Sequence, residues 1–271
     1  MQHVPTIFQQ LRQTNESREE YWSARDLAKV LEYDSFRNFE TALIKAQESC
    51  KNSGQSIKKH FVDINKMIDL GKTASREIKD LHLSRYACYL VMQNADPSKE
   101  IVALGQTYFA IQTRRQELQD QAIEDHKRVF LRGEVTSHNK HLAETASKAG
   151  VKNHGVFTNY GYKGLYGGLD SKQIHTKKKL KKHQQILDHM GSEELAANLF
   201  RATQADAKLQ RENIQGEAKA NHLHFDVGRK VRQTIKELGG TMPEKLSIQE
   251  HIDKAKRRLK KSDQVEFSNK L

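Results

Sequence analysis

One stretch of the sequence, rich in both glycine and tyrosine, restricts the possible fold more than any other. It runs from Asn153 to Leu169 and contains five glycines in seventeen residues. Glycines in that number disfavour the interior of a helix or strand, because each loses more backbone entropy on ordering than other residues do. We therefore expect residues 153–185 to form a loop that separates two modules. The aromatic residues of this stretch are Phe157, Tyr160, Tyr162 and Tyr166.

A dense cluster of lysines follows the glycine-rich stretch. It comprises Lys177, Lys178, Lys179, Lys181 and Lys182. Lysine displaces counterions from a phosphate backbone, and a tyrosine ring offers a face on which a base can stack. One interpretation is that these lysines contact nucleic acid together with Lys163 and the three tyrosines Tyr160, Tyr162 and Tyr166. The alternative is that the rings form the small core of a loop packed on its own domain.

The positive charge of the chain is distributed unevenly. The net charge is +12 over 271 residues, with 17 Lys and Arg against 15 Asp and Glu in residues 1–119 and 29 against 19 in residues 120–271. A basic excess of this size favours polyanions as partners, most simply DNA, single-stranded or duplex, and predicts binding that weakens as salt rises. The excess lies almost entirely in the second half.

Cysteine content and hydropathy indicate a cytoplasmic protein with no membrane partner. Cys50 and Cys88 are far apart in the sequence and lack the spacing of metal ligands, which is typical of two small buried side chains in a reducing compartment. The longest apolar stretch, residues 86–92, is too short to span a bilayer. The sequence has neither a leader pattern nor a glycine-rich phosphate loop of the P-loop form, and we expect no cofactor.

The N-terminal part has the pattern of a helix–turn–helix. Ser23 is placed to cap a helix whose apolar stripe is formed by Leu27, Val30 and Leu31. Asp34 or Ser35 then caps a second helix, which carries Phe36, Phe39, Leu43 and Ile44. Arg37 and Lys45 lie off this apolar stripe, where residues that enter a DNA groove would lie, although the pattern taken alone favours a solvated surface. The predicted DNA contacts of this motif are Arg25, Arg37 and Lys45.

Alternating residues around positions 60–64 and 77–83 predict two short strands after the helix–turn–helix. The segment between them, residues 71–76, is polar and contains two cations, so we expect a hairpin with a basic tip. A hairpin of this kind beside a helix–turn–helix can grip phosphate or enter a minor groove. Its predicted DNA contacts are Lys72, Arg76 and Lys79.

The sequence offers little support for an enzyme. Its thirteen histidines include a close pair, His222 and His224, which is followed by Asp226. On a strand these three side chains would share a face and could bind a metal, but on a helix they point in different directions. The flanking pattern favours a helix, and the sequence has neither a His-Glu-x-x-His motif nor a nucleophile elbow. We predict no catalytic residues and no metal site, with a metal-dependent nuclease as an alternative.

Two groups of motifs resemble known families. The segments 21–33, 37–39 and 83–94, in this order, resemble the Bro-N domain of viral Bro proteins and phage antirepressors, over roughly residues 1–115. The segments 132–140, 157–169 and 187–204 resemble the bacterial DNA-damage-inducible protein D (DinD) family, and this similarity runs along essentially the whole chain. The resemblance implies an SOS-induced protein that engages DNA repair and acts on a RecA-type recombinase filament.

The pattern and the resemblance together predict an α+β fold that is mostly α. We expect a Bro-N-like DNA-binding domain in residues 1–118, a connecting helical segment in 119–152, the loop in 153–185 and a helical C-terminal domain in 186–271. The long C-terminal helices are compatible with a homodimer. The principal alternative function is a phage-type antirepressor or transcription regulator that reads duplex DNA through Arg37 and its neighbours.

Overall fold

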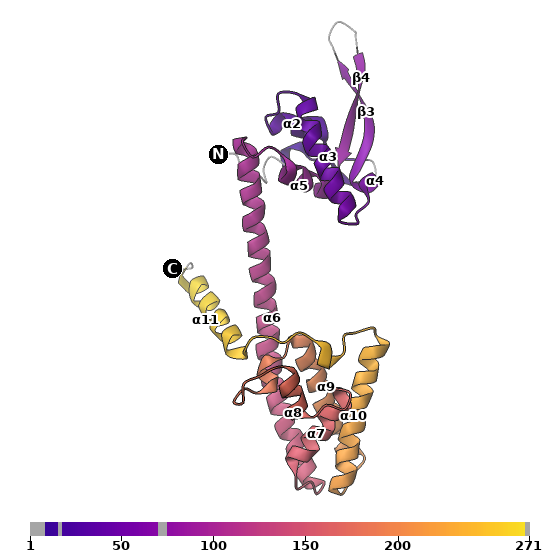
Figure 1. The fold of residues 1–271 in the computed structure, drawn as a ribbon, viewed down its shortest axis with the longest axis vertical. Coiled ribbons are helices and arrows are strands. Elements are labelled where there is room, and N and C mark those ends of the chain that lie inside the picture. Colours follow the sequence, from indigo (N-terminus) through magenta and orange to yellow (C-terminus); the bar gives the residue numbers. More distant parts are fainter. Residues whose placement is uncertain (1–8, 16–17, 70–74, 269–271) are drawn as a thin grey trace. The chain divides into compact units, whose positions relative to one another are not determined.

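The structure is a computed structural model that describes residues 9–15, 18–69 and 75–268 (Figure 1). The chain forms two compact units, residues 1–116 and 117–271. Helices make up most of both units, and the described part of the first unit also contains a four-stranded antiparallel sheet. The predicted class, α+β with mostly α, is confirmed.

The sheet of the first unit is dominated by one long hairpin. Strands β3 (Phe61–Asp69) and β4 (Ser75–Leu83) pair along their whole length, from Phe61 opposite Leu83 to Asp69 opposite Ser75. The sheet continues from β4 to β2 (Glu20–Ser23) and then to β1 (Gln13–Thr14). Sequence reasoning predicted this hairpin, but with shorter strands.

Four helices lie between β2 and residue 95 in the described part of the first unit, and each has a serine at its N-cap. They are α2 (Ala24–Val30), α3 (Phe36–Asn52), α4 (Ile57–His60) and α5 (Arg85–Asn94). The side chains of Ser23, Ser35 and Ser84 accept hydrogen bonds from free amides in the first turns of α2, α3 and α5. Of the two residues predicted to cap the second helix, Ser35 does so.

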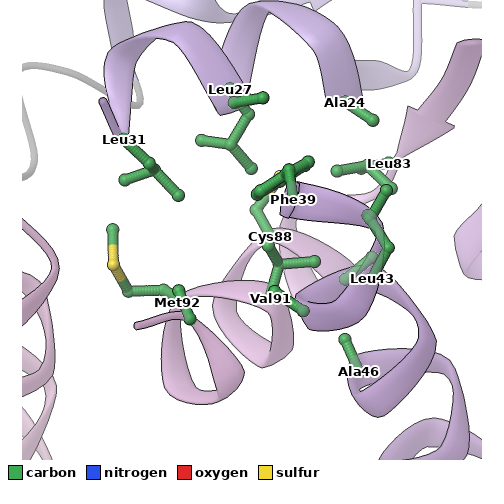
Figure 2. Packing of buried hydrophobic residues seen from close by; sticks show 14 of the residues in the cluster. Ala24, Leu27, Leu31, Phe39, Leu43, Ala46, Leu83, Cys88, Val91 and Met92 are labelled. Atoms are coloured by element: carbon green, nitrogen blue, oxygen red, sulfur yellow. The ribbon is translucent and has the colours of Figure 1, made fainter. Parts of the chain in front are cut away.

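The core of the first unit lies between α2, α3 and α5 and the base of the hairpin. Figure 2 shows Phe39 of α3 surrounded by side chains of the other elements, among them Leu27, Leu83 and Val91. Cys50 and Cys88 are buried in this core as free thiols. Burial raises the pKa of the Cys88 thiol well above its usual value, so both cysteines act as small apolar side chains.

A long helix, α6 (Glu100–Lys148), takes part in both units. Its first turns bury Val102 against the first core, and its last turns bury Val135, Leu142 and Ala146 in the second unit. The predicted connecting segment, residues 119–152, is therefore largely the second part of a helix that begins nineteen residues earlier, because α6 is not interrupted between them.

The second unit consists of helices packed around the C-terminal part of α6. They are α7 (His154–Leu165), α8 (Ser171–Lys177), η1 (Ile186–His189), α9 (Ser192–Arg211), α10 (Glu217–Glu237), η2 (Pro243–Lys245) and α11 (Ile252–Ser268). The prediction that residues 153–185 form a loop is wrong, because α7 and α8 occupy most of this range.

Close packing of α7 on α10 explains why a glycine-rich segment is helical. A Cβ atom at Gly164 would lie 2.2 Å from the carbonyl oxygen of Phe225, and one at Gly228 would lie 2.6 Å from that of Gly161. The two backbones approach so closely that only glycine fits. The dense packing of the two helices compensates for the backbone entropy that the glycines lose in a helix.

None of the helices in the described part of the chain is both long enough and apolar enough to cross a membrane.

Candidate nucleic-acid interface

Asp80 of the hairpin fixes the start of α2. Its carboxylate accepts a hydrogen bond of 2.6 Å from Ser23 Oγ and one of 3.1 Å from the Arg25 backbone amide. Asp80 is buried, and a second amide, that of Leu81, also donates to it. Since the free amides at a helix N-terminus favour negative charge, these bonds hold the helix–turn–helix rigidly against the hairpin.

Two cations add to this connection. Arg25 donates from Nε to the Lys79 carbonyl oxygen at 2.7 Å, and its guanidinium lies 4.1 Å from the centre of the Phe36 ring. Lys66 of β3 forms a 3.1 Å ion pair with Asp26 of α2. Burial acts to raise the pKa of Asp26, but Lys66 outweighs it and holds that pKa below its usual value. Arg25 thus links α2, α3 and β4, which is a structural role in addition to its predicted DNA contact.

No residue in the described part of the first unit covers the outward face of α3. At 100° per residue, the buried side of the helix carries Phe39, Leu43, Ala46 and Cys50. Residues of the opposite side are exposed, and they are Arg37, Thr41, Ile44, Lys45 and Glu48. The Ile44 side chain is 63% exposed. Arg37 and Lys45 therefore lie off the apolar stripe of the helix, as predicted from the sequence. Beside them lies Ile44, which is not part of the core.

The hairpin carries exposed basic residues that have acidic residues near them. Arg76 and Lys79 are exposed on β4, opposite Ile68 and Asn65 of β3. Since their positions differ by an odd number of residues, they lie on opposite faces of the hairpin. The acidic residues Asp63 and Glu77 are exposed as well and lie on the face of Lys79, so that face is not purely basic. Lys72, predicted at the tip, lies outside the described residues.

In the second unit the structure corrects part of the predicted site. Tyr162, Tyr166 and Lys178 are buried and cannot contact a nucleic acid. Tyr166 OH donates to Glu194 Oε1 at 2.9 Å, and Lys178 Nζ donates to Glu194 Oε2 at 2.8 Å. Burial raises the pKa of Glu194 although Lys178 and Tyr166 lower it. Lys178 points inward because an unpaired carboxylate at this depth would be costly.

Arg201 and His224 form a second buried polar group. His224 Nδ1 lies 2.9 Å from the Phe157 carbonyl oxygen, so this nitrogen carries the proton and Nε2 accepts a hydrogen bond from Arg201. The Arg201 guanidinium lies 5.1 Å from the centre of the Tyr162 ring. A Cβ atom at Gly161 would overlap both the imidazole and the guanidinium, so this glycine makes room for the pair.

The remaining predicted residues of the second unit stay on the surface. Lys177, Lys179, Lys181 and Lys182 are exposed around the end of α8. Tyr160 and Lys163 are half-buried on α7, with Lys163 Nζ 6.0 Å from the centre of the Tyr160 ring. The predicted surface of lysines and tyrosines is thereby reduced to four exposed lysines, the half-buried Lys163 and one partly exposed ring.

The histidine-rich segment does not form a metal site. His222, His224 and Asp226 belong to α10, where His222 and Asp226 are exposed and His224 is buried. Across residues 9–15, 18–69 and 75–268, no three His, Cys, Asp or Glu side chains lie together in a way that could hold a metal ion.

Sequence reasoning missed a surface between α9 and α10. Phe200 is exposed there, together with Arg211 of α9 and Arg229 and Lys230 of α10, and the half-buried Lys208 lies beside them. The available signal was the position of Phe200 in α9, since it falls beside the apolar stripe of Leu195, Leu199 and Ala202 rather than within it.

Comparisons with known proteins match both halves of the chain. Residues 10–110 match the family model of the BRO family N-terminal domain, and residues 122–255 match that of the DinD C-terminal domain. DNA damage-inducible protein D of Escherichia coli (strain K12) is 57% identical over 252 residues, which cover 90% of this chain and 91% of that protein.

Proposed function

The chain belongs to the family of DNA damage-inducible protein D, and on this basis we propose that it is a cytoplasmic SOS-response protein that binds DNA and modulates recombinational repair without catalysing a reaction itself. The N-terminal domain, residues 1–118, is the part that binds DNA. The observation that carries this assignment is the uncovered face of α3, which is held in a fixed position relative to a projecting hairpin.

The chemistry of this face suits the major groove of duplex DNA. Arg37 lies at the N-terminal end of α3, where the second helix of a helix–turn–helix reaches base edges. An arginine can pair bidentately with guanine, and the methyl groups of Thr41 and Ile44 can contact the methyl group of thymine. Lys45 is suited to a backbone phosphate.

The four exposed lysines Lys177, Lys179, Lys181 and Lys182 serve in this proposal as additional phosphate contacts. We also propose that the protein acts on a RecA-type recombinase filament, an assignment supported by family membership. An assay of strand exchange by a RecA-type recombinase, with and without the protein, tests this part. An unchanged rate at stoichiometric protein contradicts it.

The DNA-binding proposal is tested by titrating the full-length protein into fluorescent duplex DNA and following anisotropy. The double variant Arg37→Ala/Lys45→Ala is expected to bind about 10- to 100-fold more weakly, because it loses a base contact and a phosphate contact. Its matched control is Lys58→Ala/Lys59→Ala, which removes two exposed cations of α4 in the same domain. Equal affinities for both variants would contradict the assignment of α3.

The alternative function, a transcription regulator that reads duplex sequence, uses the same face of α3. It is favoured by the exposed methyl groups of Thr41 and Ile44, which offer sequence discrimination. Selection from a random duplex library separates the two functions. Enrichment of one sequence supports the regulator, and enrichment of none supports the repair function.

A further inference from the structure

A groove runs across the surface of the second unit between α9 and α10. Its volume is about 870 Å³. The wall from α9 is formed by residues spaced three or four apart, which are Phe200, Gln204, Lys208 and Arg211. The floor contains Val227 and Val231 of α10, which are buried in the unit core. The groove is therefore formed by the packing of one helix pair and does not depend on the other unit.

Four cations line this groove: Lys208, Arg211, Arg229 and Lys230. Asp226 is the one acidic residue among the groove's described lining residues. Basic residues therefore clearly outnumber acidic residues in the lining of the groove. The basic lining also continues along α10, because Arg229 and Gln233 line a neighbouring hollow together with Arg232 and Lys236.

The ion pairs near the groove are weak, so the cations can exchange their carboxylate partners for another anion. Arg229 lies 3.0 Å from Asp226 with both side chains largely exposed, and Lys208 and Arg211 each lie 3.9 Å from Glu212. Exposed pairs of this kind contribute little to stability. Lys230 forms no ion pair with any residue in the described part of the chain. Phosphate groups can thus replace these partners at small cost.

Phe200 provides an apolar face at one side of the groove. Its side chain is 53% exposed, although it lies next to the buried stripe of α9. It stacks on no other ring among the described residues. A phenyl ring left in water beside a row of cations is suited to stacking with a flat partner, such as an unpaired base.

We propose that this groove binds a segment of single-stranded nucleic acid, with phosphates at the four cations and a base stacked on Phe200. A duplex does not fit this chemistry, because its bases are already stacked on each other. The proposal rests on the proposed function in so far as the protein binds nucleic acid, but it uses a surface separate from α3. Gln204, Gln233 and Thr234 supply hydrogen bonds to base edges without requiring one sequence.

The experiment measures the affinity of the full-length protein for a fluorescent single-stranded oligonucleotide of mixed sequence. Phe200→Ala is expected to weaken binding by roughly 10- to 100-fold and to leave its salt dependence unchanged, because stacking involves no counterions. Arg229→Ala/Lys230→Ala is expected to make the slope of log K against log salt shallower by about 1.4, or about 0.7 for each phosphate.

Matched controls come from exposed residues of the same region that do not line the groove. Lys219→Ala removes a cation of α10, and Leu238→Ala removes an exposed apolar side chain. Both are expected to bind the single strand like the unaltered protein. Circular dichroism verifies that every variant retains its helices, as expected for exposed side chains.

Three results would overturn the proposal. The first is unchanged single-strand affinity in both groove variants. The second is a loss of equal size in the two controls. The third concerns a competition experiment in which a polyglutamate peptide displaces the oligonucleotide. If the peptide binds the Phe200→Ala variant and the unaltered protein with the same affinity, the groove is a site for acidic peptides. The affinity of the groove variants for duplex DNA distinguishes failure of this proposal from failure of the proposed function. If α3 is the part that binds duplex DNA, this affinity should equal that of the unaltered protein.

Discussion

Arg201 is a fully buried cation whose closest polar neighbours are neutral. Its guanidinium contacts His224 Nε2, the Asn198 side-chain oxygen at 3.5 Å and the face of the Tyr162 ring. It has no carboxylate partner among the described residues, and burial lowers its pKa. The ring face and the lone pair of a neutral imidazole supply the negative potential that a carboxylate would otherwise provide.

The neutral state of His224 has a consequence for stability. Burial, and then the charge of Arg201, hold its pKa well below the usual value. The unfolded chain therefore binds a proton that the folded chain does not, once the pH falls below about 6.5. The free energy of unfolding should decrease as pH falls through this value, by about 1.4 kcal/mol per pH unit, until the pKa of the folded state is reached.

Replacing His224 tests whether stability decreases as pH falls because of this residue. His224→Gln should lower stability near neutral pH by about 1–3 kcal/mol, because the Phe157 carbonyl and Arg201 are less well satisfied, but it should make the acid-side slope shallower. His222→Gln, an exposed position on the same helix, serves as control and should keep the slope. Urea unfolding followed by circular dichroism between about pH 7 and about pH 5 measures both. An identical slope in the two variants would contradict the neutral assignment.

At the scale of elements, the α7–α10 interface depends on three glycines. Gly161, Gly164 and Gly228 each occupy a place where a methyl group would overlap atoms of the facing helix. Glycine in a helix costs up to about 1 kcal/mol relative to alanine, whereas steric overlap in a packed core costs about 1–3 kcal/mol. Packing therefore determines which residue these positions tolerate.

A pair of alanine substitutions tests this comparison. Gly164→Ala should lower the free energy of unfolding of the second unit by about 1–3 kcal/mol or more. Gly133→Ala in α6 should raise it by about 0.5–1 kcal/mol, since a Cβ atom there meets nothing within 4 Å. Urea unfolding monitored by circular dichroism measures both changes. A stabilising effect of Gly164→Ala would refute the close approach of the helices.

The elements differ in how much of them the sequence reveals. Ser23, Ser35 and Ser84 act within their own first turns, so local sequence was sufficient to predict the helices that they cap. The glycine-rich segment was misjudged because its helical state depends on Gly228, more than sixty residues away. Similarly, the lysine cluster by itself does not reveal that Lys178 turns inward, because its partner Glu194 lies sixteen residues further along the chain.

At the scale of the molecule, the two units have separate cores and different charge. Residues 1–119 are nearly neutral, and residues 120–271 carry almost the whole basic excess. In the proposed function, the first unit binds DNA through a few well-placed side chains, whereas the second has the charge for contacts that do not depend on sequence. This asymmetry is a property of the sequence itself, which does not indicate which basic residues reach the surface.

The separate cores also allow each unit to be followed individually. Trp22 is the single tryptophan of the chain and is buried in the first unit. Its fluorescence reports unfolding of that unit, while circular dichroism reports both. Gly164→Ala should therefore destabilise the second unit without changing the urea concentration at which Trp22 fluorescence reports unfolding of the first unit.

The central claim is that the outward face of α3 contacts duplex DNA. Because Cys50 and Cys88 are fully buried, a cysteine introduced as Ile44→Cys can be labelled selectively with a photocrosslinking reagent. Irradiation with duplex DNA should crosslink this position strongly, and Leu104→Cys, an exposed position in the same unit, should crosslink weakly or not at all. Equal or stronger crosslinking from position 104 would contradict the account.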